Sequence, residues 1–137
     1  MKERSKILNL MIAKTDRTNS EHWLPLWMHS YDTAGVMEYL YHNWLPLAVI
    51  KVIGKDFGEE MGLKVCLFLA YIHDAGKLCS QFQSGVAEQV RDIREKLFQE
   101  AISLASPKNL TKKIPHSLCG EGILRKYGVP VGIAVIV

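Results

Sequence analysis

One segment, from Glu59 to Asp74, constrains the fold more than any other, because it is apolar on almost every side of the helix that it would form. Its apolar residues are Met61, Leu63, Val65, Leu67, Phe68, Leu69, Ala70 and Ile72. A helix that is apolar all round is buried among other elements. The segment therefore predicts a central helix of a helical bundle, and Gly76 is the expected end of that helix.

A second helix is expected on the amino-terminal side of this segment, from His29 to Asn43. Apolar residues lie there on one stripe of the helix, at Val36, Met37, Leu40 and Tyr41. Pro46 cannot continue a helix, so it forces a break just beyond the stripe. Gly54 and Gly58 then mark the connection to the central helix.

Two more helices are expected after the central segment. The stretch from Val86 to Leu104 has apolar residues at intervals of three and four, at Val90, Ile93, Leu97 and Ala101. This amphipathic pattern predicts one long helix that covers the core. Another helix is expected from Pro115 to Tyr127, because proline favours the first helical position and Gly128 follows the last. The apolar tail from Val129 to Val137 fits either a strand or the start of a further core helix.

The composition fits a single all-α domain over residues 1–137. A chain of this length buries roughly two thirds of the surface that its unfolded form exposes, and 48% of its residues are apolar. The formal net charge of +3 comes from lysines and arginines spread along the chain, so it does not by itself indicate a nucleic-acid partner. No apolar tract reaches the roughly 20 residues that a membrane-spanning helix needs. A soluble protein without a membrane partner is expected.

The cysteines indicate a reducing, cytoplasmic location. They are odd in number and none belongs to a Cys-x-x-Cys motif, so neither a disulfide framework nor a structural zinc site is expected. Positions in or near the core are expected for the cysteines and the tryptophans, which are Cys66, Cys79, Cys119, Trp23, Trp27 and Trp44.

The central helix is expected to end in a pair of metal-binding side chains, His73 and Asp74, within the run Ile72-His73-Asp74-Ala75-Gly76-Lys77. Neighbouring helical residues point about 100° apart, so at a helix end the imidazole and the carboxylate can converge on one cation. Such a pair suits manganese, iron, cobalt, nickel or zinc, and the carboxylate can bridge a second ion. The pair predicts a divalent-metal site, with Lys77 near enough to hold a phosphate oxygen.

Two ligands do not complete a metal site, and His29 and His116 are the best candidates for the others. Both are expected at helix starts beside loops, and a long separation in sequence is no obstacle inside a bundle. Simpler alternatives are a hydrogen-bonded His-Asp pair, polar histidines at two helix starts and a solvated lysine. Asp32 is favoured as a first-turn charge over a partner of a ligand histidine. Surface or interface positions are expected for the remaining histidines, His22 and His42.

These motifs resemble, in their order, those of the HD nuclease domain of the CRISPR-associated helicase-nuclease that degrades DNA in type I interference systems. The early motif is His29-Ser30 followed by Asp32-Thr33-Ala34, and the central motif is His73-Asp74-Ala75-Gly76-Lys77 followed by Gln81-Phe82-Gln83. The later motif is Pro115-His116-Ser117 before a helix with small residues. Many phosphohydrolases of the HD superfamily share the His-Asp pair, but the phenylalanine-glutamine element and the early motif narrow the choice.

The resemblance implies an HD-domain helical bundle that cleaves single-stranded DNA with one or two divalent ions of manganese, nickel, cobalt, iron or magnesium. It also implies a helicase portion or subunit as partner, and recruitment by a guide-RNA surveillance complex. Carried over by motif, the metal ligands would be His29, His73, Asp74 and His116. Asp74 would be catalytic as the bridge between two ions, and Lys77 would lie near the scissile phosphate.

The chain departs from the family pattern in one respect. Members place a further histidine pair and a later aspartate after the motif that contains His116, and this sequence ends before any of them. The tail from Val131 to Val137 is similar to the helix that leads into the missing pair. We therefore expect a domain truncated at its C-terminus, which binds metal weakly at one position and has little nuclease activity alone.

Two other functions are consistent with the same residues. An HD phosphohydrolase acting on nucleotides or cyclic dinucleotides would use the same His-Asp centre in a closed pocket of the size of one base. A non-catalytic helical module would keep the fold and bind partner proteins through the apolar tail. Release of phosphate from small nucleotides favours the first alternative. Unchanged function and metal content after His73→Ala and Asp74→Ala favours the second.

Overall fold

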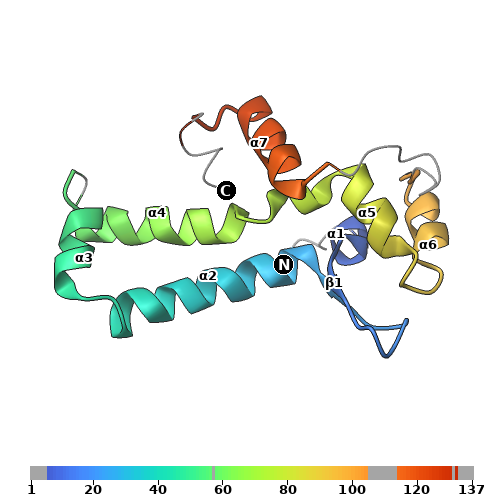
Figure 1. Ribbon diagram of the computed structural model, residues 1–137, viewed down its shortest axis with the longest axis horizontal. Coiled ribbons are helices and arrows are strands. Elements are labelled where there is room, and N and C mark those ends of the chain that lie inside the picture. The colour runs from blue at the N-terminus through green and yellow to red at the C-terminus, as the bar shows by residue number, and fades with distance from the viewer. Residues whose placement is uncertain (1–5, 57, 105–113, 131, 133–137) are drawn as a thin grey trace. The chain divides into compact units, whose positions relative to one another are not determined.

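The computed structural model describes residues 6–56, 58–104, 114–130 and 132 (Figure 1). The described part is mostly helical, which confirms the expected helical class, and its contacts divide the chain into two compact units. The first unit comprises Met1–His29 and Asp74–Val137, and the second comprises Ser30–His73. A single domain over the whole chain stays a prediction. Among the described residues, no helix combines the length and the apolar character needed to span a membrane.

The first unit is built from short helices and a two-stranded antiparallel sheet. Its elements are α1 (Lys6–Leu10), β1 (Ile12–Thr15), β2 (Trp23–Pro25), the start of α2 (Leu26–Asn43), the 3-10 helix η1 (Ala75–Leu78), α5 (Ser80–Ala87), α6 (Ile93–Gln99) and α7 (His116–Lys126). In the sheet, Lys14 lies opposite Leu24 and Thr15 lies opposite Trp23. This hairpin was not expected, because its strands of four and three residues are too short to show an alternating pattern.

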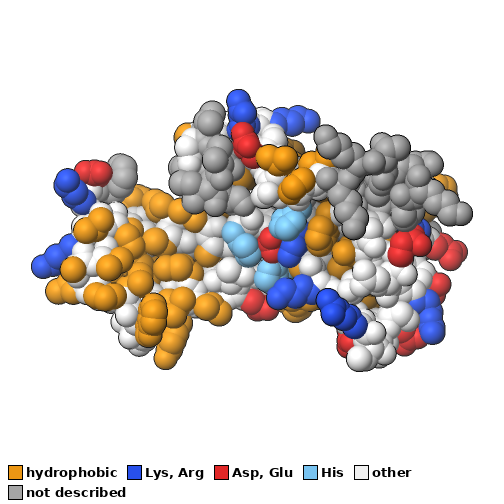
Figure 2. Space-filling model, in the orientation of Figure 1, with side chains coloured by type: hydrophobic (Ala, Val, Ile, Leu, Met, Phe, Trp, Pro, Cys, Tyr) orange, Lys and Arg blue, Asp and Glu red, His pale blue; other side chains and the backbone are white. Residues whose placement is uncertain are grey.

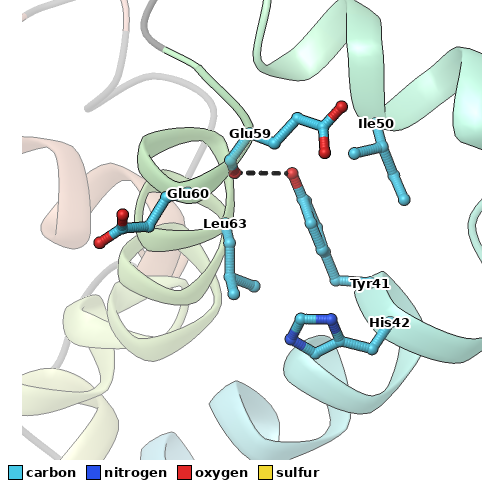
Figure 3. A pocket seen from close by; sticks show the side chains of 6 residues that line it. All are labelled: Tyr41, His42, Ile50, Glu59, Glu60 and Leu63. Atoms are coloured by element: carbon cyan, nitrogen blue, oxygen red, sulfur yellow. Dashed lines mark hydrogen bonds between the residues drawn. The ribbon is translucent and has the colours of Figure 1, made fainter.

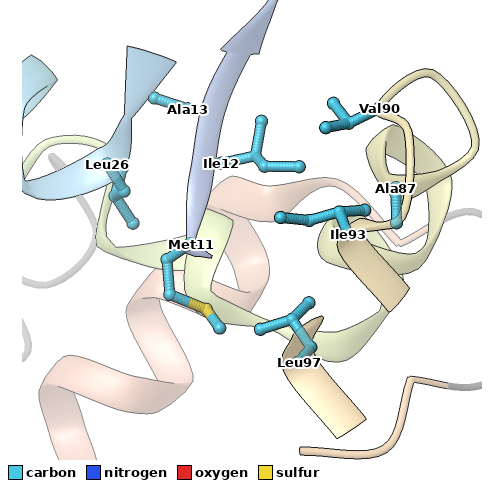
Figure 4. Close-up of a cluster of buried hydrophobic side chains, with 8 residues drawn as sticks. All are labelled: Met11, Ile12, Ala13, Leu26, Ala87, Val90, Ile93 and Leu97. Atoms are coloured by element: carbon cyan, nitrogen blue, oxygen red, sulfur yellow. The ribbon is translucent and has the colours of Figure 1, made fainter. Parts of the chain in front are cut away.

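The hydrophobic core of the first unit forms around β1, where side chains from helices, strand and loop meet (Figure 4). Its buried members are Met11, Ile12, Ala13, Leu26, Ala87, Val90, Ile93 and Leu97. Each large apolar side chain that leaves water contributes about 1.5–3 kcal/mol to stability. Because Leu26 is the first residue of α2, this core also fixes where α2 begins, one turn before His29.

Leu97→Ala should lower the free energy of unfolding by about 2–5 kcal/mol, because Leu97 is 0% exposed and its removal leaves a cavity. Phe98→Ala is the matched control, since Phe98 is the next residue of α6 and is 71% exposed. The control should change stability by no more than about 0.5 kcal/mol. Urea denaturation measures both changes, and equal losses at the two positions would contradict the assigned core.

The single helix expected from Val86 to Leu104 is wrong, because the chain turns between α5 and α6. Asp92 has a φ of 55°, in the left-handed region that a helix interior does not contain. The backbone N–H of Arg91 donates to the carbonyl oxygen of Ser20 at 2.8 Å, so the turn is tied to the hairpin loop. Ala101 is exposed. The other expected core positions are nevertheless buried, namely Val90, Ile93 and Leu97.

The second unit consists of the rest of α2 together with α3 (Leu47–Ile53) and α4 (Glu59–Ile72). In Figure 1, α2 and α4 run side by side, and side chains of both helices make contacts between them. The rings of Tyr31 and Tyr71 meet edge to face with centroids 5.2 Å apart. The Tyr41 hydroxyl donates a hydrogen bond to the carbonyl oxygen of Glu59 at 3.0 Å. Aromatic residues near both ends of the helix pair α2 and α4 therefore hold the two helices together.

The helix bounds agree closely with the expected ones in this part of the chain. The helix α2 begins at Leu26, one turn before its expected start, and α4 ends at Ile72, two residues before its expected end. The break at Pro46 is present, because α3 begins at the next residue. The tail expected from Val129 to Val137 lies mostly outside the described residues.

A cavity of about 340 Å³ lies beside the hydrogen bond between Tyr41 and Glu59 (Figure 3). It is lined by Tyr41, His42, Ile50, Glu59, Glu60 and Leu63. The imidazole of His42 lies 5.8 Å from the ring of Tyr41, centroid to centroid. None of the expected metal ligands lines this cavity.

The expected burial of α4 on all sides is wrong. Among the residues of α4 only Gly62 is buried, and Trp44, which was also expected in the core, is 74% exposed. Four large apolar residues of α4 are between 38% and 46% exposed, namely Met61, Val65, Phe68 and Tyr71. The apolar character of a helix shows what it can bury in contact with neighbours, but it does not show that the neighbours are present.

Candidate metal centre

The expected site residues meet at the carboxylate of Asp74. Asp74 lies between α4 and η1, at the N-cap position of η1, and is 7% exposed. The Nε2 atom of His29 lies 2.9 Å from its Oδ2 atom, and Nζ of Lys77 lies 2.6 Å from the same oxygen. The Nε2 atom of His116 lies 3.4 Å from its Oδ1 atom. Two imidazoles and one ammonium therefore face one buried carboxylate.

A different short segment of the first unit places each of these side chains. His29 lies in the first turn of α2, which follows β2 without a break, so the hairpin and the core hold it. Lys77 lies in η1, where its backbone N–H donates to the carbonyl oxygen of Asp74 at 2.9 Å. His116 is the first residue of α7, and Pro115 before it, with a φ of −55°, is already set for a helix start.

Gly76 allows α7 to approach η1 closely enough to bring His116 to the carboxylate. A Cβ atom on Gly76 would overlap the backbone carbonyl oxygen of His116 and would lie 2.6 Å from the backbone nitrogen of Gly120. Both atoms belong to helix backbone, so neither can move aside as the end of a flexible side chain could. Gly76 was expected only as a helix end, and its packing against α7 was not foreseen.

Lys77 is buried nearly as deeply as its partner, since the side chains of Lys77 and Asp74 are 11% and 10% exposed. A buried ammonium needs a counter-ion, because an unpaired charge in the protein interior is costly. The alternative of a solvated lysine therefore does not hold. An ammonium has three N–H donors, so Lys77 can donate to Asp74 and also to a phosphate oxygen.

Phe82, in α5, packs beside both His116 and Lys77. Its ring centroid lies 5.7 Å from that of the His116 imidazole in an edge-on arrangement, and 5.6 Å from Nζ of Lys77. Aromatic rings pack edge to face with one another and attract cations over their faces. Phe82 therefore restricts the positions of both groups. The motif Gln81-Phe82-Gln83 had been noticed without a role for this ring, and its short distance in sequence from Lys77 was the available signal.

His73 precedes Asp74 directly and is the C-cap of α4. Its Nδ1 atom lies 2.7 Å from the carbonyl oxygen of Ala70, which can only accept a hydrogen bond, so Nδ1 carries the proton. In a neutral ring the lone pair is then on Nε2, the nitrogen that can bind a metal. His73 and Asp74 offer ligand atoms within 4.8 Å of each other, and with His29 they form a group suited to a metal ion.

Two residues that were expected outside the ligand set have other surroundings. His22 lies in the hairpin loop, where its Nδ1 atom is 4.0 Å from the carboxylate of Asp16 and 3.3 Å from the side-chain nitrogen of Asn19. Asp32 is exposed on α2. The position of His22 agrees with a surface histidine. The expected first-turn position of Asp32 is wrong, because α2 begins at Leu26 and its first turn contains no acidic residue.

Two cysteines, Cys79 and Cys119, lie in segments that carry the site. Cys79 caps α5, because its sulfur accepts a hydrogen bond from the backbone N–H of Phe82 at 3.5 Å. Burial, with a smaller contribution from a hydrogen bond with Cys79, raises the pKa of Cys119 to about 11. Near neutral pH, Cys119 is therefore a neutral thiol, which is neither a good ligand nor a good nucleophile.

Comparisons with known proteins found sequences similar to this chain. A protein-family model described as "Cas3, HD domain" matches residues 13–135. The CRISPR-associated nuclease/helicase Cas3 of Streptococcus thermophilus is 34% identical to the chain over 140 residues. This alignment includes 90% of the chain and 15% of that relative, so the chain spans only a small part of the relative's length. No solved structure matches the chain.

Proposed function

The chain belongs to the Cas3 HD domain family, and from this premise we propose that it is a metal-dependent nuclease domain that cleaves single-stranded DNA in CRISPR type I interference. One observation carries the proposal: His29 and His116 approach the two different oxygens of the buried Asp74 carboxylate. Imidazole and carboxylate donors that converge in this way suit a transition-type divalent ion. The relative is itself described as a nuclease/helicase, which supports a nucleic acid as the substrate class.

The donor set fits such an ion, with His29, His73, Asp74 and His116 as the proposed ligands. His29 and Asp74 are now joined by a hydrogen bond of 2.9 Å, and a ligand role requires His29 to present a lone pair in its place. Manganese, nickel, cobalt and iron suit imidazole, and magnesium suits the carboxylate. A bound ion would supply an activated water and would stabilise negative charge on the phosphate. Weak binding of one ion by this chain stays a prediction.

Lys77 has the role of orienting the substrate in this proposal. Its ammonium is held by Asp74 at 2.6 Å, so its position is defined before a substrate arrives. A preset point charge can hold a nonbridging oxygen of the scissile phosphate without ordering a flexible side chain during the reaction. Phe82 supports this ammonium on one side.

The second unit supports a protein partner. Figure 2 shows apolar side chains over much of the visible face of α2, α3 and α4. The large apolar residues that are exposed in the described part of this unit are Tyr31, Val36, Tyr39, Trp44, Leu47, Val49, Val52, Met61, Val65, Phe68 and Tyr71. Large apolar surfaces of this kind mark contacts with other proteins. The proposed partners are a helicase portion or subunit and, through it, a guide-RNA surveillance complex.

Removal of divalent metal should abolish cleavage of single-stranded DNA, and added manganese or nickel should restore it, because in this proposal the bound ion supplies the activated water. The assay follows an end-labelled single-stranded DNA with the purified chain in EDTA and after addition of each metal. Duplex DNA of the same sequence is the matched substrate control.

Two results of the same assay would contradict the proposal. Cleavage that persists unchanged in EDTA would exclude a metal-dependent reaction. Metal-dependent release of phosphate from small nucleotides, without any cleavage of DNA, would assign the same residues to a nucleotide phosphohydrolase.

A further inference from the structure

Gln83 is a fully buried polar residue, 1% exposed, that uses both ends of its side-chain amide. Its Oε1 atom accepts a hydrogen bond from the backbone N–H of Ile12 at 3.0 Å. Its Nε2 atom donates to the carbonyl oxygens of Ile12 at 2.9 Å and of Lys77 at 2.7 Å. These partners fix the orientation of the amide, because only Nε2 can donate to two carbonyl oxygens.

The two bonds to Ile12 replace the pairing that a neighbouring strand would give. Antiparallel strands exchange an N–H and a carbonyl oxygen between opposite residues, and the amide of Gln83 offers the same two partners to Ile12. Ile12 is 0% exposed, so its backbone groups would be costly to leave without partners. One N–H of Gln83 is sufficient for this purpose, and the second N–H is used elsewhere.

The second N–H of Gln83 donates to a residue of the candidate metal centre. It binds the carbonyl oxygen of Lys77, the residue whose ammonium lies 2.6 Å from the carboxylate of Asp74. The helix η1, which carries Lys77, is only four residues long. A 3-10 turn of this length has poor hydrogen-bond geometry and little stability of its own. Gln83 therefore joins a weak turn to a strand in the core.

We propose that Gln83 is a positioning residue for the nuclease reaction, and that it holds Lys77 in place by tying η1 to β1. This inference rests on the proposed function, since that function assigns Lys77 its role. Gln83 touches neither metal nor DNA in this scheme. Its effect on cleavage passes entirely through Lys77.

Two substitutions remove this link in different ways. Gln83→Met keeps the length of the side chain and removes all three hydrogen bonds. Gln83→Glu keeps the shape and the acceptor for Ile12, but it has no donor for Lys77, so it tests the link if Gln83→Met does not fold. Leu97→Ala is the control for a general loss of core stability. Ser84→Ala is the control for the next buried position of α5, where the hydroxyl has no hydrogen-bond partner among the described residues.

Amide hydrogen exchange tests the link without reference to activity. The N–H groups of Lys77 and Cys79 close η1 through bonds to Asp74 and Gly76. Both should exchange about tenfold faster in either Gln83 variant, relative to the N–H of Lys96 in α6, because one hydrogen bond that holds the turn is lost. In Leu97→Ala all three should accelerate together, and in Ser84→Ala none should. Equal acceleration of all three in the Gln83 variants would reduce Gln83 to a general structural role and overturn the proposal.

Cleavage kinetics then test whether the effect passes through Lys77. Each Gln83 variant should reduce kcat by about 10 to 100 times, as the loss of a residue that orients a ligand does. In a Lys77→Met background, the same Gln83 variant should cause less than about a twofold further reduction, because the residue that it positions is already absent. Leu97→Ala should reduce kcat by the same factor in both backgrounds. If the reduction in kcat caused by the Gln83 substitution were the same with and without Lys77→Met, so that the two factors multiplied, the proposal would be overturned.

Failure of the nuclease proposal gives a different result. If the chain cleaves no DNA with any metal, but its η1 amides lose protection in the Gln83 variants, the link between η1 and β1 is supported and the nuclease function is contradicted. If both Gln83 variants cleave DNA at the normal rate, the nuclease function is supported and the positioning role of Gln83 is contradicted.

Discussion

Asp74→Asn should reduce metal-dependent cleavage of single-stranded DNA by at least about 100-fold, because it removes the proposed charged ligand that His29, Lys77 and His116 face. Loss of residues that merely orient a ligand costs about 10–100-fold in metal affinity or activity, so loss of the ligand charge itself should cost more. Asparagine keeps the size of the side chain. The substitution therefore leaves the packing nearly unchanged, and the change in activity measures the loss of the negative charge and of the second ligand oxygen.

The same substitution should destabilise the chain, and a second change should repair this. Asp74→Asn leaves the ammonium of Lys77 buried without its counter-ion, which typically costs about 3–5 kcal/mol. Adding Lys77→Met removes the unpaired charge, so the double variant should recover most of the stability lost in the single variant. It should recover neither cleavage nor bound manganese. Urea denaturation, elemental analysis and the DNA assay measure the three quantities separately.

Asp32→Asn is the matched control for this experiment, because Asp32 is an exposed carboxylate on α2. It should leave cleavage unchanged and should alter stability by no more than about 0.5 kcal/mol. A double variant of Asp74 and Lys77 that cleaves DNA at the rate of the unchanged chain would show that Asp74 is not a ligand. An equal loss of activity in Asp32→Asn would indicate that Asp32 is a partner of a ligand histidine, the alternative that was not favoured from the sequence.

The helices that surround the centre could be predicted from sequence because their signals are local. Pro46 and Pro115 lie next to observed helix starts, and apolar stripes mark the helices themselves. The structure also brings His29, Asp74 and His116 together, as expected from the motifs. Their roles as ligands remain predictions, since closeness alone does not show that a metal binds.

The features that escaped prediction depend on contacts between distant parts of the chain. The left-handed turn at Asp92 interrupts an apolar pattern that continues across it, so the pattern alone predicts one helix. The amide of Gln83 reaches a strand 71 residues earlier, and no local signal marks such a bond. The exposure of Phe68 in α4 could not be predicted for the same reason. The sequence shows that the surface of this helix is apolar, but it does not show which elements pack against that surface.

Gly76→Ala should weaken both stability and cleavage, because the added methyl group would overlap the backbone of His116. The helices η1 and α7 would have to separate, and extra atoms in a packed interior cost about 1–3 kcal/mol or more. His116 would then move away from the carboxylate, from which it is now 3.4 Å. Displacement of a catalytic group by about 1 Å can reduce activity about 100-fold, so a loss of this size is expected.

Three glycine substitutions form a graded series that separates close packing from helix propensity. At Gly120, a Cβ atom would lie 3.1 Å from the backbone nitrogen of Gly76, a tighter contact than usual but no overlap. At Gly122, in the same helix α7, nothing lies within 4 Å. Gly122→Ala should therefore stabilise the helix by up to about 1 kcal/mol, and Gly120→Ala should fall between it and Gly76→Ala. Thermal or urea denaturation gives the order, and the DNA assay should follow it. If Gly76→Ala were as stable and as active as Gly122→Ala, close contact between η1 and α7 would not be what places His116 at the carboxylate.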